Sequence, residues 1–318
     1  MSKYHQLTQE ERYRITAHRM AGDSSAEIAR LLGRHRSTIG REVRRNARTH
    51  DGSYGAEKAH GYARARLRRC RRGPQFSEKD LARVDNLVRR KWSPEQIAGF
   101  FKKKRVMSIS HETIYRRLRR EKKSGGELWK STRIMSKFGR KRYRSHDSRG
   151  VLPGKRHISE RPAEVELRKR IGHWEGDTVM GSDMRHCILT LVERVTGYVI
   201  IKKLRARSKA EVTKAATWAI RSHYRKFKTI TFDNGTEFHD YKLLEERFTL
   251  KCYFATPYHS WERGSNENMN GLIRQYLPKG ECMSDVTQAR CDFIAHELNT
   301  RPRKRHGYST PADLYQRH

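Results

Sequence analysis

The segment GHWEGDTVMGSDMRHCILTLVERVTGYVIIKKL (172–204) decides the fold of the C-terminal half of the chain. It predicts three strands, the last two joined by a hairpin turn near Thr196 and Gly197. Residues 208–224 have the spacing of an amphipathic helix. The remaining elements are a strand over 228–232, a helix over 241–248, a strand over 251–258, and helices over 261–276 and 284–299. We therefore expect an α/β core built on a mixed five-stranded sheet.

Three carboxylates lie at informative places in this predicted core. Asp177 is within the first strand, Asp233 directly follows the fourth, and Glu267 is within the helix over 261–276. Successive acids are separated by 55 and 33 residues. Because the carboxyl ends of strands line the functional crevice of an α/β sheet, we expect the three acids to meet there. Oxygen ligands without a soft partner suit Mg²⁺ or Mn²⁺, and two such ions can serve displacement at phosphorus.

Each acid also has a simpler interpretation. Asp233 precedes Asn-Gly and could be only a turn residue. Glu267 could be an exposed helix residue, and Glu262, which points to another side of the same helix, competes for the third position. Glu175 shares a strand face with Asp177 and is a candidate substitute or auxiliary for it. The residue pattern alone leaves these alternatives open.

Charge indicates the kind of partner. The formal net charge is +36, and residues 1–150 carry 41 Lys and Arg against 15 Asp and Glu. This excess favours nucleic acid binding over a merely soluble basic protein or a ribosomal one. No apolar stretch is long enough to span a membrane and no signal-peptide core is present, so we expect a cytoplasmic protein. The five scattered cysteines fit free thiols in a reducing compartment, without the ligand spacing of a zinc site.

Residues 1–60 predict a first helix-turn-helix domain. Thr8 and Glu11 form a capping-box pattern, and a second helix capped by Ser24 or Ser25 leads through Gly33 into a third. This third helix has the pattern of one that enters a major groove. The arginines on or beside its exposed side are Arg34, Arg36, Arg41, Arg44 and Arg45. We expect base-edge or nearby contacts from Arg36, Ser37, Thr38 and Arg41.

A weaker copy of this unit follows. Residues 93–101 parallel 24–32, and residues 110–118 repeat the Thr-Ile-x-Arg element. We predict that residues 61–129 contain a basic segment and a second helix-turn-helix, with Arg116 and Arg117 as DNA contacts. The basic segment, residues 61–73, either extends a helix or tracks along phosphates, or it is a solvated linker. Residues 130–162 predict an interdomain linker, and 163–318 the catalytic core.

The chain resembles bacterial insertion-sequence transposases of the DDE class, and most closely insertion-sequence family thirty. The blocks that carry the resemblance are GHWEGDTV, TFDNGTEF and YHSWERGSNENMNGLIRQYLPKG, together with the N-terminal segment ending in REVRRN. The resemblance implies a core with the retroviral-integrase, RNase H-like fold. It also implies Asp177, Asp233 and Glu267 as the metal-binding triad, with two Mg²⁺ or Mn²⁺ ions.

The resemblance further implies a transposase that binds terminal inverted repeats, cleaves a strand with water, and transfers it with a DNA 3′-hydroxyl. Asn270 and Arg274 share the helix face of Glu267, and they either contact DNA phosphate, hold the glutamate, or only pack. We expect a homodimer or higher oligomer in a synaptic complex with transposon ends and target DNA. Such a bacterial protein would be nucleoid-associated. The competing interpretations are a transcription regulator, an RNase H-type nuclease and a Tyr or Ser recombinase.

Overall fold

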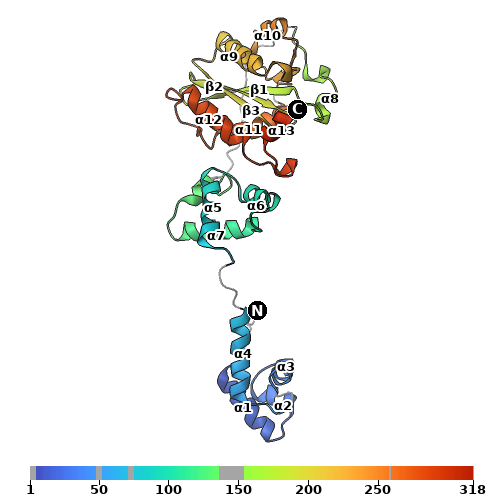
Figure 1. Ribbon diagram of the computed structural model, residues 1–318, viewed down its shortest axis with the longest axis vertical. Coiled ribbons are helices and arrows are strands. Elements are labelled where there is room, and N and C mark those ends of the chain that lie inside the picture. Colours follow the sequence, from blue (N-terminus) through green and yellow to red (C-terminus); the bar gives the residue numbers. More distant parts are fainter. Residues whose placement is uncertain (1–4, 48–51, 71–74, 136–153, 258, 318) are drawn as a thin grey trace. The chain divides into compact units, whose positions relative to one another are not determined.

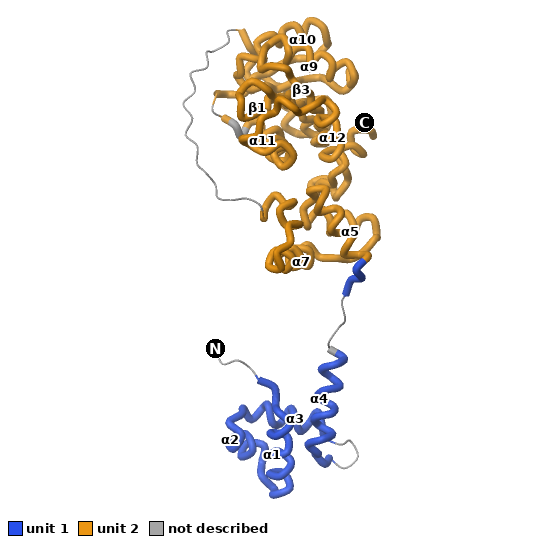
Figure 2. The backbone as a smooth tube through the Cα atoms, turned by 90° about the vertical axis from the view of Figure 1, so that its left-hand side faces the viewer, with its two compact units in different colours: residues 1–78 blue, residues 79–318 orange. Residues whose placement is uncertain are grey.

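The computed structural model describes residues 5–47, 52–70, 75–135, 154–257 and 259–317. Two compact units make up the chain, Met1–Glu78 and Lys79–His318 (Figure 2). In the described residues, no helix is both long and apolar enough to cross a membrane. We describe each unit by itself.

The described residues of the first unit form four helices, and the first of them begins with a capping box. The side chains of Thr8 and Glu11 each accept a hydrogen bond from the other's backbone N–H, and Ser24 and Glu27 repeat this arrangement. Gly33, with φ of 59°, turns the chain into the third helix. The predicted helix-turn-helix is therefore present. The helices are α1 (Gln9–Met20), α2 (Ser25–Leu31), α3 (Arg36–Asn46) and α4 (Ala56–Cys70) (Figure 1).

Helix α4 contains most of the basic stretch that we predicted over 61–73, and the predicted domain boundary at residue 60 falls inside this helix. Ala59 is fully buried in one apolar cluster with Ile15 and Ile39, from α1 and α3. Burial of this kind ties a helix to its neighbours. Residues 61–70 thus extend the first unit rather than beginning the second helix-turn-helix.

The second unit opens with its own three helices, α5 (Glu78–Arg89), α6 (Pro94–Lys103) and α7 (His111–Lys123). Ser93 caps α6 and Ser110 caps α7. This helix-turn-helix packs on the core that follows it. Lys91 Nζ donates to the carbonyl oxygen of Gln275 at 2.6 Å, and a side chain at Gly99 would collide with the ring of Tyr308.

The core is a mixed sheet with the strand order β3-β2-β1-β4-β5. Strand β2 pairs antiparallel with β1 and β3, whereas β4 runs parallel to β1 and β5 parallel to β4. The fold class expected from the sequence is thereby confirmed. The strands are β1 (His173–Met180), β2 (Cys187–Glu193), β3 (Val199–Leu204), β4 (Thr229–Phe232) and β5 (Lys251–Phe254).

Helices cover both faces of this sheet (Figure 1). Because side chains alternate along a strand, Trp174 of β1 joins the cluster under α9 and α10, whereas Val179 joins the cluster under α11 and α12. The predicted helices begin later than expected, at residue 264 for α11 and residue 288 for α12. The remaining helices are α8 (Glu164–Leu167), α9 (Lys209–Ser222), α10 (Tyr241–Arg247), α11 (Gly264–Ile273), α12 (Gln288–Asn299) and α13 (Pro311–Arg317).

Part of the segment that we predicted as a linker belongs to the core. Within 130–162, residues 136–153 lie outside the described residues, but 154–162 pack against the sheet. Phe254 N donates to the carbonyl oxygen of Arg156 at 2.9 Å. Arg161 is buried and its Nη1 donates to Thr231 Oγ1 at 3.1 Å. A basic sequence looked like a linker because the partners that hold it to the sheet, Thr231 and Phe254, are distant in the chain.

Candidate active site

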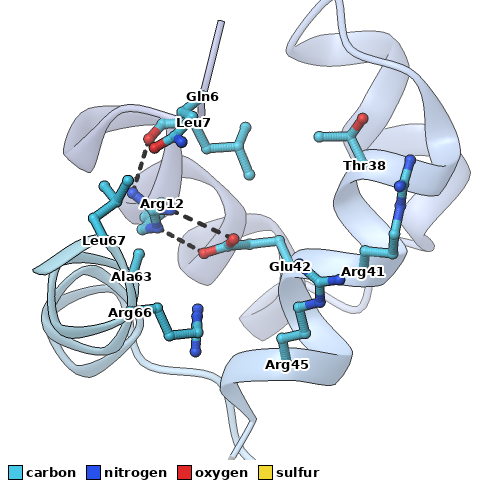
Figure 3. Close-up of a pocket in the computed structure, with 10 residues that line it drawn as sticks. All are labelled: Gln6, Leu7, Arg12, Thr38, Arg41, Glu42, Arg45, Ala63, Arg66 and Leu67. Atoms are coloured by element: carbon cyan, nitrogen blue, oxygen red, sulfur yellow. Dashed lines mark hydrogen bonds and ion pairs between the residues drawn. The ribbon is translucent and has the colours of Figure 1, made fainter. Parts of the chain in front are cut away.

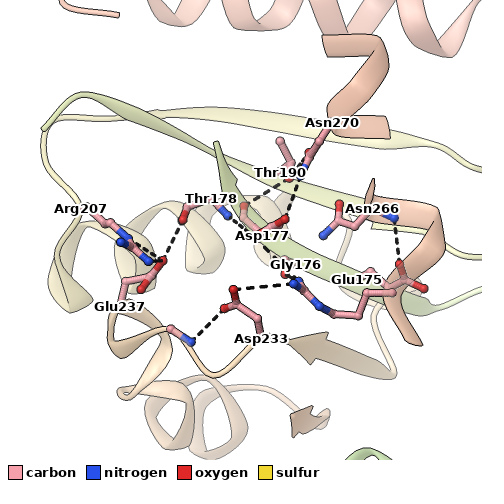
Figure 4. A network of polar contacts seen from close by, with 12 residues as sticks. Glu175, Gly176, Asp177, Thr178, Thr190, Arg207, Asp233, Glu237, Asn266 and Asn270 are labelled. Atoms are coloured by element: carbon pink, nitrogen blue, oxygen red, sulfur yellow. Dashed lines mark hydrogen bonds and ion pairs between the residues drawn. The ribbon is translucent and has the colours of Figure 1, made fainter. Parts of the chain in front are cut away.

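Strand register places two of the predicted acids side by side. In the parallel pair β1 and β4, Glu175 is opposite Thr231. Asp177 and Asp233 each come two residues later, so they are level with each other and on the same face of the sheet. Neighbouring strands lie about 5 Å apart, which brings the two carboxylates into electrostatic contact. This is the face covered by α11 and α12, as Figure 4 shows for Asn266 and Asn270 of α11.

Asp177 is held by hydrogen bonds from two directions. The backbone N–H of Thr178 donates to its Oδ1 at 2.9 Å, and Asn270 Nδ2 donates to its Oδ2 at 2.8 Å (Figure 4). Burial raises the pKa of Asp177 to about 6, against the opposing effect of nearby Arg263. The side chain is therefore oriented, mostly out of water, and adjacent to positive charge.

Arg263 lies between the two aspartates. Its Nη1 is 3.8 Å from Asp177 Oδ1, and its Nη2 is 3.7 Å from Asp233 Oδ2. These distances are those of ion pairs rather than of good hydrogen bonds. The hydrogen bond of Arg263 goes instead to the carbonyl oxygen of Gly176, at 3.1 Å. With 13% of its side chain exposed, Arg263 is a largely buried counter-ion shared by two carboxylates.

Asp233 has the turn role that we considered as well as its place in the site. Its Oδ1 accepts from the N–H of Gly235 at 3.0 Å. A Cβ at residue 235 would lie 2.9 Å from this oxygen and 2.4 Å from Glu237 Oε2. Only glycine fits between the two acids. The turn therefore fixes the direction of the Asp233 carboxylate, and the two interpretations do not compete.

Glu237 is a buried acid that our sequence analysis did not select. Its Oε1 accepts from Thr178 Oγ1 at 2.8 Å and from Arg207 Nε at 2.8 Å (Figure 4). Thr178 follows Asp177 directly, so this carboxylate braces the strand at the site. The signal was available, since Glu237 belongs to the TFDNGTEF block and Arg263 to the WERG sequence.

Glu267 stands apart from the two aspartates. Its side chain is exposed on α11, and the three carboxylates do not come within 4.8 Å of one another. The helix itself is fixed to β1 on both sides of Glu267. The N–H of Asn266 donates to Glu175 Oε2 at 2.9 Å, and Asn270 binds Asp177. The backbone of Glu267 is thus placed beside the sheet while its side chain points to solvent.

The two competing acids have other partners. Glu262 accepts hydrogen bonds from the N–H and the hydroxyl of Thr256, at 2.8 and 2.9 Å. Glu175 is fully buried, and its Oε1 lies 3.2 Å from Arg194 Nη1. Both carboxylates are therefore engaged in holding the fold, which removes the reason to prefer them over Glu267 or Asp177.

Comparisons with known proteins agree with this geometry. Residues 168–260 match the integrase core domain, and residues 3–46 match a helix-turn-helix domain. The chain is 40% identical to the transposase for insertion sequence element IS4351 of Bacteroides fragilis, over 99% of this chain and 96% of that protein. It is 35% identical to transposase InsI for IS30A of Escherichia coli, over 98% of this chain and 83% of that protein.

The chain belongs to the insertion-sequence transposases. The family expected from the three sequence blocks, including its link to family thirty, is confirmed. This transposase is accordingly a DDE-type polynucleotidyl transferase that binds DNA, and its core belongs to a divalent-metal-dependent domain family. Among solved structures, the catalytic core domain of BIV integrase matches at 18% identity and a TM-score of 0.37, over 46% of this chain and 95% of that one.

The predicted DNA contacts of the transposase separate into two groups. Arg34 and Arg117 lie in ion pairs, with Glu11 at 2.7 Å and with Asp85 at 2.7 Å. Arg274 Nη2 donates to the carbonyl oxygen of Met180 at 2.8 Å, and Asn270 holds Asp177, so the packing and positioning interpretations fit these two. Thr38 is half-buried. The exposed members of the prediction are Arg36, Ser37, Arg41, Arg44, Arg45 and Arg116.

One further group in the described residues has metal-ligand chemistry. Asp183, His186 and Cys282 lie together at the turn between β1 and β2. His186 Nδ1 is hydrogen-bonded to Asp183 Oδ2, and Cys282 Sγ donates to the same oxygen at 3.4 Å. The three side chains satisfy one another, and we assign them no role.

Proposed function

We propose that Asp177, Asp233 and Glu267 are the catalytic triad of this transposase, and that they hold two Mg²⁺ or Mn²⁺ ions when it acts on DNA. In the same proposal, the helix-turn-helix units bind the terminal inverted repeats of an insertion sequence. The observation that carries it is the pair of level carboxylates, Asp177 and Asp233, that share one cation, Arg263.

The donor set suits a hard divalent cation. Both aspartates offer carboxylate oxygens to the same small region, and that region already holds a positive group. Within the described residues, no sulfur or imidazole ligand joins the pair in a cluster. Oxygen-only ligands favour Mg²⁺ or Mn²⁺ over zinc. Such ions, when bound, supply a more acidic water and stabilise the leaving oxygen.

The surrounding residues keep the acids in place. Asn270 orients Asp177, and the Gly235 turn orients Asp233. Glu175 fastens the start of α11 to β1, and this fixes where the backbone of Glu267 lies along β1. In this proposal, the Glu267 side chain turns from solvent toward the two aspartates to complete the triad. Positioning by packed elements is what displacement at phosphorus requires.

Both reaction steps have the same form. In cleavage, a water oxygen bonds to phosphorus while the bond from phosphorus to the 3′ oxygen breaks, which leaves a free 3′-hydroxyl. In strand transfer, that 3′-hydroxyl bonds to a phosphorus of target DNA while a target phosphodiester bond breaks. One P–O bond forms as another is lost in each step. A covalent protein–DNA intermediate is unnecessary, so the proposal needs no Tyr or Ser nucleophile.

Two transposon ends must be joined to one target, so we include a homodimer or higher oligomer on DNA in the proposal. A protein that acts on chromosomal DNA in this way would work in the bacterial cytoplasm, associated with the nucleoid. A transcription regulator would have no use for the level pair of aspartates, and a nuclease of RNase H type would use them for cleavage alone.

The test is an oligonucleotide cleavage and strand-transfer assay with Mg²⁺, on duplexes that carry the element's own terminal repeat. We compare the wild type with Asp233→Ala and Glu267→Gln, and use Glu262→Gln as the matched control on the same segment. Both triad variants should bind the duplex but neither cut nor join it, whereas Glu262→Gln should retain both steps. Full activity of either triad variant would refute the assignment, and cleavage without joining in the wild type would indicate a nuclease.

A further inference from the structure

A cavity of about 310 Å³ lies between α3 and α4 in the first unit (Figure 3). Helix α4 is outside the segment 3–46 that matches the helix-turn-helix domain. Both helices contribute arginines to the walls. The polar and charged lining residues that the argument uses are Arg12, Thr38, Arg41, Glu42, Arg45 and Arg66.

The positive charge of this cavity is mostly uncompensated. Arg12 is buried and paired with Glu42, with Nε 2.6 Å from Oε1. By contrast, Arg41 Nε donates to the carbonyl oxygen of Ser37 in its own helix, and Arg66 Nη2 donates to the neutral amide oxygen of Asn46. In the part of the chain that the structure describes, none of Arg41, Arg45 and Arg66 forms an ion pair. Three guanidinium charges therefore remain around one hollow, which favours an anion there.

The walls of the cavity are fixed before any ligand arrives. Ala59 of α4 is fully buried, and Tyr54, just before α4, donates its hydroxyl to Glu42 Oε1 at 3.3 Å. The hydrogen bond to Asn46 holds Arg66 against α3 at 2.6 Å. This hydrogen bond orients the exposed Arg66 side chain, and preorganisation of this kind favours binding.

Helical spacing orders the exposed residues of α3 relative to this cavity. At about 100° per residue, Arg44, Ser37, Arg41 and Arg45 follow one another along one arc, and only Arg41 and Arg45 of these four line the cavity. If Ser37 and Arg44 face base edges when α3 enters a major groove, Arg45 and Arg66 would lie nearer the edge of the groove, where the phosphates lie.

We propose that this cavity, lined by Arg41, Arg45 and Arg66, binds a phosphodiester of the DNA backbone and so fixes the register of α3 in the groove. The inference rests on the proposed DNA binding by the first unit, but not on the catalytic triad. It assigns Arg41 to phosphate rather than to bases, and it gives α4 a function in the domain. Phosphate contacts of this kind position a protein without reading sequence.

The experiment measures the dissociation constant of the full chain for two labelled 30-base-pair duplexes, by fluorescence anisotropy over a range of salt concentrations. One duplex carries the terminal repeat and the other a scrambled sequence of equal composition. Arg45→Gln and Arg66→Gln should each weaken binding to both duplexes by the same factor. Each should also reduce the slope of log Kd against log salt by about 1, because one phosphate contact is lost.

Arg64→Gln is the matched control, since it removes the same charge from α4 on the side away from the cavity. Its slope should change by less than half of the Arg66→Gln change, and Arg66→Lys should keep most of the wild-type slope. The proposal is overturned if Arg66→Gln and Arg64→Gln behave alike, or if the loss occurs only on the terminal repeat. If the wild type binds DNA but does not cleave it, the proposed catalysis is contradicted. The comparison of the cavity variants can still be interpreted, because it measures binding alone.

An independent observation concerns Arg263, whose guanidinium stands between Asp177 and Asp233. We infer that Arg263 is the resident counter-ion of the metal-free site and gives way when a divalent cation binds the same carboxylates. This inference rests on the proposed triad. One guanidinium cannot fully neutralise two carboxylates, and its ion-pair distances of 3.7 and 3.8 Å are long. Its hydrogen bond to the Gly176 carbonyl keeps it nearby as a positioning residue.

The experiment measures direct binding of Mn²⁺ to the protein without DNA. The paramagnetic resonance signal of the free ion reports how much Mn²⁺ remains unbound. Removing a competing positive charge should tighten Mn²⁺ binding, so Arg263→Gln should lower the dissociation constant roughly tenfold. Arg263→Lys should stay near the wild type. Arg221→Gln, which removes an equal charge from the exposed side of α9, should change it less than twofold. Unchanged or weaker Mn²⁺ binding by Arg263→Gln would contradict the inference. Asp233→Asn tests the proposed triad separately, since Mn²⁺ binding should be lost in that variant.

Discussion

The two helix-turn-helix units of this transposase share local sequence but differ in what surrounds them. In the first, Arg12 of α1 pairs with Glu42 of α3. In the second, Asp85 of α5 pairs with Arg117 of α7, so the same helix-to-helix link has its charges reversed. Residues 42 and 117 occupy matching places after the shared Thr-Ile-x-Arg element. The comparison teaches that the side chain at this position links two helices in both units, so we expect an arginine there to hold the fold rather than read DNA.

The units also differ in their outer partners. The first adds α4, which leaves the α3–α4 cavity open and basic. The second packs on the core, where Arg90 Nη2 is 2.9 Å from Glu297 Oε1 and Lys91 contacts Gln275. A helix-turn-helix anchored to a catalytic core is suited to holding DNA at a fixed place relative to the active site. The following predictions test this contrast, beginning with the largest expected effect.

Loss of the acidic partner should harm the first unit more than the second. Arg12 and Glu42 have side chains only 6% and 11% exposed, against 33% and 14% for Arg117 and Asp85. Glu42→Gln leaves a buried guanidinium unpaired and should cost about 3 kcal/mol. Asp85→Asn should cost about 1 kcal/mol, because Arg117 can turn to water. The measurement is amide hydrogen exchange in α1 and α5 during urea unfolding. Equal losses would break the comparison.

A pair of glycines tests the anchoring of the second unit. A Cβ at Gly99 of α6 would lie 2.1 Å from the ring of Tyr308, whereas one at Gly40 of α3 meets nothing within 4 Å. Gly99→Val should therefore destabilise the second unit by about 2 kcal/mol through overpacking. Gly40→Ala should stabilise α3 by about 0.5–1 kcal/mol, as expected for a helix interior. Calorimetric melting of both variants gives the signs, and a neutral Gly99→Val would show that the contact with Tyr308 is not maintained in solution.

Arginines on the two third helices should separate DNA binding from folding. Arg44 is exposed on α3, so Arg44→Gln should weaken binding to the terminal repeat by roughly tenfold while the melting temperature stays unchanged. Arg117→Gln should lower the melting temperature but leave the affinity within about twofold, because its guanidinium already binds Asp85. Anisotropy titration and calorimetry on the same samples distinguish the two effects. A reversal of the two phenotypes would restore Arg117 to the DNA-contacting set.

The smallest expected effect concerns pH. Burial, with the nearby Lys226 and Lys202 charges, lowers the pKa of His223, which packs against the rings of Tyr198 and Tyr315. Its folded pKa lies below its unfolded value near 6.5, so the unfolded chain takes up the proton first as the pH falls. Stability is therefore lost below about pH 6.5. His223→Phe keeps an aromatic ring and should show a smaller drop in melting temperature between pH 7.5 and 5.5. An identical drop in both proteins would mean that His223 does not contribute.

Much of the local structure was predictable because it depends on neighbouring residues. Thr8 with Glu11, and Ser24, identify helix starts, and the pattern along 172–204 identifies strands. Domain limits were harder to predict. The boundary at 60 fell within α4, and the linker extended into residues that pack on the sheet, because composition records charge and not distant partners.

The sequence by itself determined the elements, the three acids and the family, since each depends on short segments whose spacing is written in the chain. Only the tertiary structure decided which charges meet. It set Arg263 between Asp177 and Asp233, turned Glu267 to solvent, and placed Arg66 opposite Arg45 across a cavity. The physical reason is that electrostatic energy depends on separation in space and on burial, and neither can be read from separation along the chain.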